Sequence, residues 1–239
     1  YDSSSIKVIG SSGVMWSTAL KQEMLDYLPQ AIMFDSLASS EAMGIGNSVM
    51  TASGEAPTAK FKVSAHTRVF DENGQPVEPG SGQSGLLARG GYLPLGYYKD
   101  EAKTAETFRI FGGERYSVPG DMCTVDSDGT INLLGRGSQC INSGGEKIFP
   151  EEVEQALKDH PCADDALVFG MPDPQWGQAV HAVVRRSKDA PESDEAELRT
   201  YLRTNLAGYK IPKRIIFTEQ DLRLANGKAD YLTAKALMS

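Results

Sequence analysis

The stretch that most constrains the fold of this chain is Gly135–Glu154, which reads GRGSQCINSGGEKIFPEEVE. Its first half combines glycines with small polar residues and has no hydrophobic periodicity, which predicts a hinge and a loop whose backbone turns sharply. Its second half places Pro150 before three glutamates, with Val153, Ala156 and Leu157 spaced for one apolar face. A proline at the first helical position and acids in the first turn predict the start of a helix. We therefore expect a loop attached directly to a rigid helix.

Composition narrows the classes of function. The 239 residues are 40% hydrophobic, which is enough for one good core or two modest ones. A formal charge of -8 without any run of lysine and arginine argues against a nucleic-acid or anionic-membrane binder, and no apolar run predicts a membrane span. Cys123, Cys140 and Cys162 are odd in number, a poor disulfide framework, and they are scattered without a C-x-x-C, which argues against a Cys/His metal site, so a reducing cytoplasm fits best. Because the chain begins at Tyr1, directly before a strand-like segment, it is expected to begin within a longer protein.

The first forty residues predict an α/β arrangement. The expected elements are a strand at Ile6–Ile9, a turn at Gly10–Gly13, a helix capped by Ser17, a strand at Ala31–Phe34 and a loop at Asp35–Glu41. Leu20, Met24 and Leu28 are expected on the apolar face of the helix. Sheets of this kind bind ligands at the carboxyl ends of their strands, where both small-residue segments lie.

The pattern changes after Ala65, where short strands alternate with turn sequences such as Asp71–Gly74 and Asp126–Gly129. This predicts a small antiparallel sheet or barrel. The later elements are expected to be helices at Pro150–Lys158 and Asp194–Leu206 and strands at Ala166–Phe169, Ala179–Arg185 and Arg214–Phe217. They form a compact α+β unit of about a hundred residues, a size that can fold alone. We therefore predict two domains, 1–135 and 136–239.

Four residues could carry chemistry, and each also has an ordinary interpretation. Arg136 could bind ribose hydroxyls or a phosphate, or pair with a surface carboxylate. Asp121 follows Pro-Gly and could be a turn acid. Glu41 could hold Mg²⁺ beside phosphate oxygens or lie solvated. Lys228 lies on a turn near the C-terminus, where lysines are commonly just solvated.

Together, and in this order, these segments resemble the adenylate-forming acyl-CoA synthetases, the superfamily that also contains firefly luciferase and peptide-synthetase adenylation domains. The resemblance covers nearly the whole chain but only the later part of such an enzyme. It is carried by the segments Ser12–Gly13, Leu37–Glu41, Gly82–Gly90, Gly96–Phe108, Val118–Asp121, Gly135–Glu154 and Asn226–Lys228. The family's phosphate-gripping loop lies upstream of the matched part and is not in this sequence.

The resemblance implies a role for each matched residue. Ser12, Gly13 and Leu37 would line the binding pocket for the adenine of ATP or AMP. Leu37 stands where an aromatic residue is usual in the family, so weaker stacking on the adenine is expected. Asp121 and Arg136 would hold the ribose. Ser40 would touch the α-phosphate, Glu41 would hold Mg²⁺, and Lys228 would place a charge between the substrate carboxylate and the α-phosphate. The C-terminal domain would swing about Ser138, where the family usually has Asp or Lys, so that the loop containing Gly144 and Gly145 forms a wall of the CoA tunnel.

The resemblance further implies an ATP-dependent acid-thiol ligase that converts a carboxylic acid, ATP and CoA into acyl-CoA, AMP and pyrophosphate. The sequences of the segments Ser143–Lys147 and Asn226–Tyr231 most resemble those of fatty-acid or steroid-side-chain ligases. Two alternatives are an adenylation domain that passes its acyl group to a carrier protein, and a catalytically inactive nucleotide-binding module. A homodimer is left open.

Overall fold

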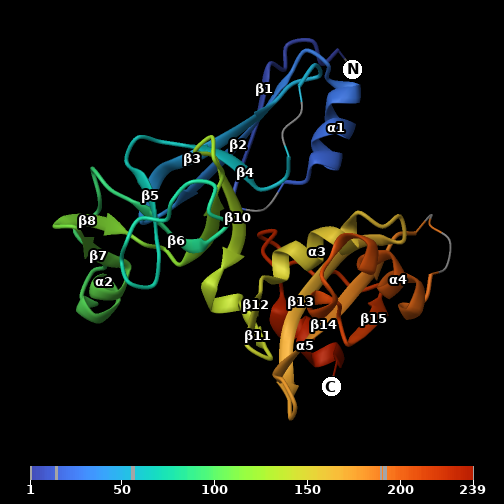
Figure 1. Ribbon diagram of the computed structural model, residues 1–239. Helices are drawn as coiled ribbons and strands as arrows, with labels where there is room; N and C mark the ends of the chain where they lie inside the picture. The colour runs from blue at the N-terminus through green and yellow to red at the C-terminus, as the bar shows by residue number, and fades with distance from the viewer. Residues whose placement is uncertain (1, 14–15, 55–56, 189, 191–192, 239) are drawn as a thin grey trace. The chain divides into compact units, whose positions relative to one another are not determined.

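The computed structural model forms two compact units, residues 1–134 and 135–239 (Figure 1). It describes residues 2–13, 16–54, 57–188, 190 and 193–238. No helix in these ranges is long and apolar enough to cross a bilayer. Within the described ranges, the first unit contains a ten-stranded sheet with two α-helices, and the second contains a five-stranded sheet with three, which confirms the predicted mixture of α/β and α+β structure.

The first unit is built around a sheet in the order β1-β2-β3-β4-β10-β9-β6-β8-β7, with β5 paired to β6. Its elements are β1 Val8–Ser12, α1 Thr18–Tyr27, β2 Ile32–Ser39, β3 Ala42–Met50, β4 Lys60–Val63, β5 Thr67–Phe70, β6 Ser84–Arg89, α2 Glu101–Thr107, β7 Phe108–Phe111, β8 Glu114–Ser117, β9 Asp121–Val125 and β10 Ile131–Arg136. This order is open across the described strands, so the predicted small barrel is not found. The antiparallel strands and their turns are as expected.

Two segments predicted as loops belong to strands. Gly10–Ser12 continues β1, and most of Asp35–Glu41 continues β2, because β1 and β2 pair in parallel from Val8 with Ile32 to Ser12 with Ser36. β2 also pairs with β3 on its other side. Backbone hydrogen bonds, from one neighbouring strand for β1 and from two for β2, outweigh the weak strand preference of small polar residues.

Helix α1 begins as predicted, because Ser17 accepts a hydrogen bond from the backbone N–H of Leu20. The predicted apolar face is wrong at one position, since Leu20 is 48% exposed. The residues of α1 that are buried are Lys21 and Leu25. The helix therefore packs a lysine, as well as leucine, against the sheet.

The second unit has a sheet in the order β12-β11-β14-β13, with β15 paired to β14. Its elements are a 3₁₀ turn at Gly137–Gln139, β11 Ile141–Ser143, β12 Glu146–Ile148, α3 Pro150–Lys158, β13 Ala163–Asp173, β14 Gly177–Arg186, α4 Glu195–Asn205, a second 3₁₀ turn at Gly208–Lys210, β15 Arg214–Thr218 and α5 Tyr231–Met238. Helix α3 has the predicted bounds, and Asp194 caps α4 by accepting from Glu197 N–H. Helix α5 was not predicted.

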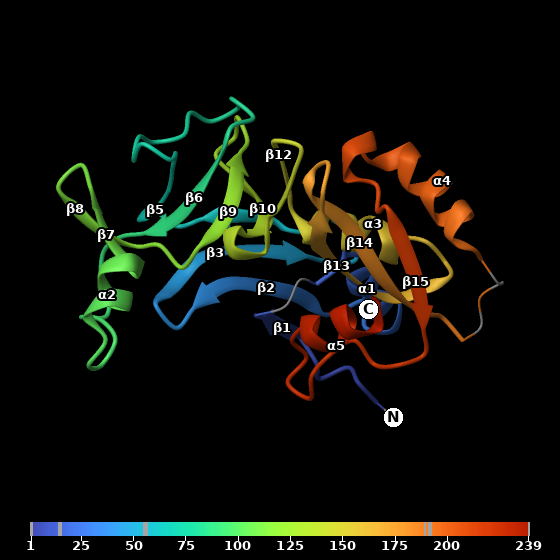
Figure 2. The ribbon, with the colours of Figure 1, turned by 90° about the horizontal axis from the view of Figure 1, so that it is seen from below.

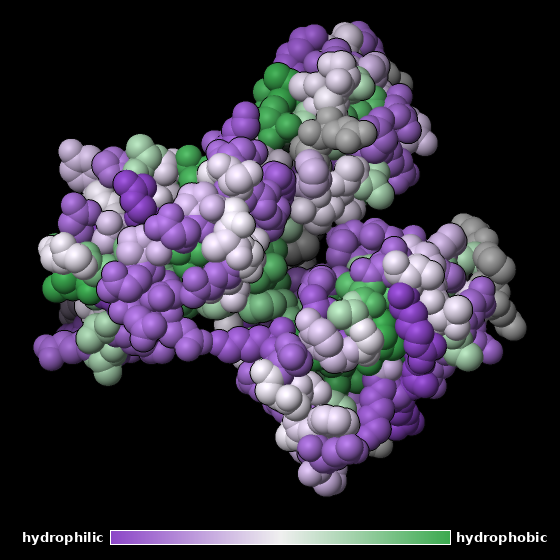
Figure 3. Space-filling model, viewed as in Figure 1, coloured by the Kyte–Doolittle hydropathy of each residue, from purple (hydrophilic) through white to green (hydrophobic). Residues whose placement is uncertain are grey.

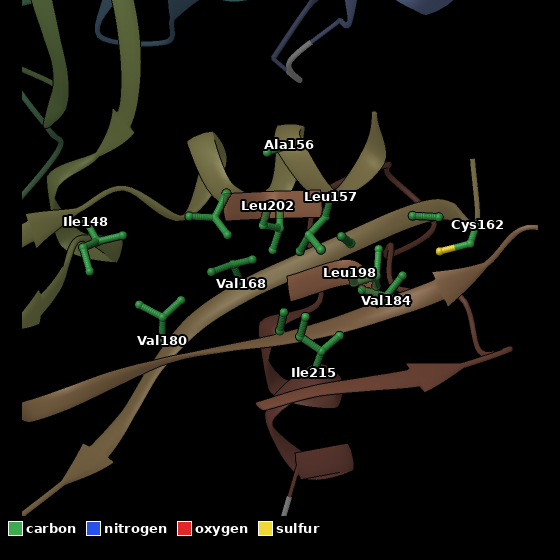
Figure 4. Packing of buried hydrophobic residues seen from close by; sticks show 14 of the residues in the cluster. Ile148, Ala156, Leu157, Cys162, Val168, Val180, Val184, Leu198, Leu202 and Ile215 are labelled. Atoms are coloured by element: carbon green, nitrogen blue, oxygen red, sulfur yellow. The ribbon is translucent and has the colours of Figure 1, made fainter. Parts of the chain in front are cut away.

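Alternation along the strands of this unit sends side chains to two cores on opposite faces of the sheet. Ala166 and Val168 of β13 pack with α3 and α4, whereas Leu167 and Phe169 pack with Ala234 of α5. Figure 2 shows α4 and α5 on opposite sides of these strands. Figure 4 shows the first core, which includes Leu157, Leu198 and Leu202. Each fully buried leucine contributes roughly 1.5–3 kcal/mol, so this unit has a substantial core of its own.

The visible surface is mostly hydrophilic, with hydrophobic residues gathered in small groups (Figure 3). The most exposed large apolar side chains include Tyr92, Leu95 and Tyr98.

The three cysteines should differ sharply in reactivity toward a thiol reagent. Cys123 is fully buried, and burial raises the pKa of its thiol to about 12; burial also raises the pKa of Cys162, which is 1% exposed. Cys140 is only half-buried, although burial raises its pKa as well. Because the thiolate is the reactive form, we expect Cys140 to be modified first and the other two only after unfolding. Mass spectrometry of peptides from iodoacetamide-treated native chain would check this order, which early labelling of Cys123 would contradict.

Candidate functional site

Parallel pairing brings the predicted adenine residues together at the carboxyl end of β1. Ser12 is the last residue of β1 and lies opposite Ser36, and its Oγ donates a hydrogen bond to the Ser36 carbonyl at 2.9 Å. Gly13 follows in an exposed position with a φ of +84°, a conformation that favours glycine. Leu37 is the next residue of β2 and packs partly against the core of the first unit. The structure thus places Ser12 and Leu37 on strands rather than on the loops expected, and Gly13 in a bend directly after β1.

Glu41 lies at the turn between β2 and β3, directly after the exposed Ser40. Its Oε1 accepts a hydrogen bond of 2.5 Å from the phenol of Tyr97. This bond to the carboxylate raises the pKa of Tyr97, with a smaller contribution from burial. The backbone N–H of Tyr97 donates to Thr104 Oγ1 at 2.9 Å, and the Lys103 ammonium lies 4.6 Å from the centre of the Tyr97 ring.

Tyr97 was missed as a site residue by the sequence analysis. The only signal was its place in the Gly96–Phe108 segment, because nothing local relates a tyrosine to a glutamate 56 positions earlier. Gly96 has its own reason to be glycine, since a Cβ there would lie 2.5 Å from Thr104 Cγ2. The tight packing of Gly96 against α2 brings the loop close enough for Thr104 to hold Tyr97.

Glu41 fits the role of a Mg²⁺ ligand supported by phosphate. Across the described ranges, no group of three or more His, Cys, Asp and Glu side chains could hold a metal ion. Magnesium is commonly bound by one or two carboxylates together with phosphate oxygens of the substrate. A half-buried carboxylate that is oriented by a tyrosine is suited to that kind of site rather than to an all-protein cage.

Asp121 and Arg136 occupy the ends of neighbouring strands of the sheet. Asp121 is the first residue of β9, after Gly120 with a φ of +98°, and Arg136 is the last residue of β10. Arg136 is exposed, and its backbone N–H donates to Glu151 Oε1 at 3.4 Å. Gly135 makes room for that carboxylate, since a Cβ there would lie 2.0 Å from Glu151 Oε2. Its φ of +134° also lies in a range that favours glycine over residues with a Cβ.

The predicted loop that contains Gly144 and Gly145 is the tip of a β-hairpin, whereas Asn142 and Ser143, expected in the same loop, belong to strand β11. β11 and β12 pair from Ile141 with Ile148 to Ser143 with Glu146. The two turn residues, Gly144 and Gly145, have φ values of +59° and +92°, as hairpin turns of two residues require. Ser138, the predicted hinge, is exposed and lies in the 3₁₀ turn that precedes this hairpin.

Gly144 also has a close neighbour on the adjacent hairpin. Its N–H donates to the Trp176 carbonyl at 2.9 Å, and a Cβ would lie 2.8 Å from the Trp176 ring. Trp176 itself is 49% exposed. The tip that contains Gly144 and Gly145 is therefore held next to an accessible indole.

Lys228 lies on a tight turn, as predicted, and is exposed. We call Leu224–Lys228 the Lys228 turn. It is closed by hydrogen bonds of 2.8 Å from Leu224 N–H to the Lys228 carbonyl and from Gly227 N–H to the Leu224 carbonyl. The Lys228 N–H donates to Asn226 Oδ1 at 3.0 Å, and Gly227 has a φ of +79°. The Asn-Gly pair thus shapes the turn and presents the ammonium to solvent.

Comparison with known proteins places these features in a family. Residues 152–228 match the family described as the AMP-binding enzyme C-terminal domain. The chain is 47% identical, over 237 residues, to a medium/long-chain-fatty-acid–CoA/3-oxocholest-4-en-26-oate–CoA ligase of Mycolicibacterium smegmatis, which covers 98% of this chain and 43% of the relative. It is 48% identical to a 3-oxocholest-4-en-26-oate–CoA ligase of Rhodococcus rhodochrous, covering 98% of this chain and 42% of that one.

Solved structures share the fold. The o-succinylbenzoate CoA synthetase MenE of Bacillus subtilis, in complex with the acyl-adenylate OSB-AMP, has a TM-score of 0.73 at 26% identity and covers 94% of this chain and 45% of that one. The anthranilate CoA ligase AuaEII, in complex with anthranoyl-AMP, has a TM-score of 0.79 at 21% identity, covering 99% of this chain and 45% of that one. The chain spans less than half the length of these relatives. On this basis it belongs to the adenylate-forming, AMP-binding enzymes and corresponds to a C-terminal part of such a protein.

Proposed function

We propose that this chain is part of an ATP-dependent acyl-CoA synthetase that acts on a medium- or long-chain fatty acid or a steroid-side-chain acid. The observation that carries the proposal is the 47% identity to a ligase named for those substrates, which extends over 98% of this chain. The protein would convert the acid, ATP and CoA into acyl-CoA, AMP and pyrophosphate. In this proposal, residues 1–135 belong to the large adenylation domain and 136–239 form the lid domain. Cytoplasmic location and assembly as a homodimer stay predictions.

In the first half-reaction, a carboxylate oxygen of the acid attacks the α-phosphorus of ATP, the bond to the bridging oxygen breaks, and pyrophosphate leaves with the electron pair. Ser12, Gly13 and Leu37 contact adenine, and Ser40 binds the α-phosphate. A Mg²⁺ ion held by Glu41 would offset negative charge on the phosphates. The orientation of Glu41 by Tyr97 supports this role, because a fixed carboxylate loses little freedom when it binds a cation.

Three charged residues complete this half-reaction in the proposal. Asp121 and Arg136 bind the ribose hydroxyls. The Lys228 ammonium lies between the attacking carboxylate and the α-phosphate, where it offsets the repulsion between two anions. The exposure of Lys228 on a shaped turn supports this role, since a group that acts on substrate must be reachable.

In the second half-reaction, the thiol of CoA attacks the acyl carbon of the adenylate, loses its proton, and AMP leaves. The hairpin tip with Gly144 and Gly145 would line the path of the pantetheine arm. Two glycines suit this place because the arm passes close to the backbone.

The function is tested by ATP–pyrophosphate exchange in the whole protein with fatty, steroid-type and aromatic acids, followed by thioester formation with free CoA or with a carrier protein. We expect exchange with a fatty or steroid-type acid and product with free CoA. Product with a carrier protein alone would support the peptide-synthetase alternative. Absence of exchange with every acid, in protein that is folded by circular dichroism, would contradict the proposal.

The hinge makes a prediction of its own. Residues of a 3₁₀ turn have φ near -60°, a value that proline adopts, so Ser138→Pro should leave the observed turn folded. Fixing φ should prevent the backbone change that a domain swing needs. We expect one half-reaction to be retained and overall turnover to fall at least about tenfold, whereas Ser138→Ala should stay near wild type. Measuring both half-reactions separately checks this, and unchanged turnover in Ser138→Pro would place the pivot elsewhere.

A further inference from the structure

The Lys228 turn has little structure of its own that could fix its position. Its hydrogen bonds are local, joining residues at most four positions apart. Its position on the unit must come from the residues that flank it. These are Leu222 and Arg223 on one side and Ala229–Tyr231 on the other, and the two sides are joined by an isolated bridge between Arg223 and Ala229 and by a 3.0 Å hydrogen bond from Asp230 N–H to the Leu222 carbonyl.

Arg223 anchors the side before the turn. Its Nε and Nη2 donate to the two carboxylate oxygens of Asp165, each at 2.7 Å. This is the bidentate geometry in which arginine fixes both position and orientation. Burial acts to raise the pKa of Asp165, but the hydrogen bonds and charge of Arg223 outweigh it and hold that pKa below its usual value. The pair is therefore ionised near neutral pH.

Tyr231 anchors the side after the turn. Its phenol donates to Glu154 Oε1 at 3.0 Å, and its ring packs partly in the core beside Leu222. Glu154 is 5% exposed, and burial raises the pKa of this carboxyl. Tyr231 is also the first residue of α5, whose first turn is held by Asp230, which accepts from Thr233 N–H at 3.1 Å and from Thr233 Oγ1 at 2.7 Å.

Both carboxylates are themselves tied to the backbone of strand β13. Glu154 Oε1 accepts from the Val168 N–H at 3.0 Å, and Asp165 Oδ1 accepts from the Ala166 N–H at 2.9 Å. β13 pairs with β14 along one side, so these side chains satisfy backbone donors that β14 does not. Each carboxylate thus joins the most buried strand of the unit to one end of the Lys228 turn.

We propose that Arg223 and Tyr231 are positioning residues that hold the two ends of the Lys228 turn on β13 and α3, and so set where the Lys228 ammonium acts in adenylation. The proposal rests on the role proposed for Lys228. Neither residue touches substrate. They act because misplacing a reacting group by about 1 Å can lower a rate by about a hundredfold.

The test uses Tyr231→Phe, which keeps the ring in the core and removes only the phenol oxygen, and Asp165→Asn, which weakens the grip on Arg223. The matched control is Tyr201→Phe in α4, because that tyrosine is also partly buried but packs against His160 on the opposite face of the sheet. Hydrogen exchange of the Leu224, Gly227 and Asp230 amides reports on the turn without reference to catalysis. We expect exchange to become about tenfold faster in Tyr231→Phe and Asp165→Asn and to stay unchanged in Tyr201→Phe.

The two half-reactions, measured in the whole protein, report on catalysis. We expect adenylation in Tyr231→Phe to fall about 10- to 100-fold, with thioester formation from supplied acyl-adenylate within about twofold of wild type. The proposal would be overturned if hydrogen exchange of the turn amides were unchanged in Tyr231→Phe, or if that variant lost both half-reactions equally. Should Asp165→Asn fail to fold, Tyr231→Phe carries the test alone. Failure of the Lys228 role is seen separately, because Lys228→Ala would then change both half-reactions equally or leave both unchanged, whatever the hydrogen-exchange rates show.

Discussion

Lys228→Ala is expected to lower adenylation in the whole protein at least about a hundredfold, while thioester formation from supplied acyl-adenylate changes by less than about twofold. The reason is that two anions, the substrate carboxylate and the α-phosphate, must meet in the first half-reaction. A cation placed between them acts only there. Lys228 is exposed on its turn, so the loss of its side chain should not destabilise the fold.

ATP–pyrophosphate exchange measures the first half-reaction, and release of AMP from acyl-adenylate plus CoA measures the second. Lys188→Ala is a suitable control, because Lys188 is an exposed lysine of the same unit and its substitution changes the net charge by the same amount. Lys228→Arg keeps the charge but replaces a compact ammonium by a planar fork, so partial activity is expected. An equal loss of both half-reactions in Lys228→Ala would contradict the role assigned to Lys228 in adenylation.

The second large effect is a loss of stability in the first unit, where Lys21 and Asp35 form a buried ion pair. Lys21 Nζ lies 3.2 Å from Asp35 Oδ2, and the two side chains are 1% and 5% exposed. Burial raises the pKa of Asp35, and Lys21 partly opposes that rise. Lys21→Met leaves a buried carboxylate without its cation, which should lower the free energy of unfolding by about 3–5 kcal/mol.

The decrease in the free energy of unfolding caused by Lys21→Met should become smaller as pH falls. A carboxyl whose pKa is raised on folding favours the fold when it is protonated, and this contribution disappears as pH rises through the folded-state pKa. Without Lys21, the pKa of Asp35 should rise further. We therefore expect the difference between wild type and Lys21→Met to be largest at neutral pH and to shrink as pH falls toward the usual value for aspartate.

Urea unfolding followed by Trp16 fluorescence would measure this effect, since Lys21 Nζ lies 5.6 Å from the Trp16 ring. A Trp176→Phe background removes the other tryptophan, which belongs to the second unit. The exposed Lys62→Met serves as the control, and the double variant Lys21→Met/Asp35→Leu should recover much of the loss because no buried charge is left. A change below about 1 kcal/mol in Lys21→Met would mean that water or another group compensates Asp35.

Local signals determined much of the secondary structure and several features of the site. Pro150 with its acidic first turn predicted α3 at its observed bounds, and Ser17 and Asp194 cap their helices as expected. Lys228 lies on a turn, as predicted, and the Asn-Gly pair shapes that turn. These features depend on backbone conformation and on hydrogen bonds between residues a few positions apart, so the sequence contains their causes.

Tertiary structure decided the remainder. Gly10–Ser12 is strand because β2 lies beside it, and Lys21 is buried because it pairs with Asp35. Of the two predicted alternatives, a small antiparallel sheet or a barrel, the described strands form an open sheet. The tertiary structure also brought Tyr97 to Glu41 and Tyr231 to Glu154, pairs that are 56 and 77 positions apart. The physical reason is that such pairs form only when the whole chain pays the entropy of closing the intervening loops, which no short window of sequence records.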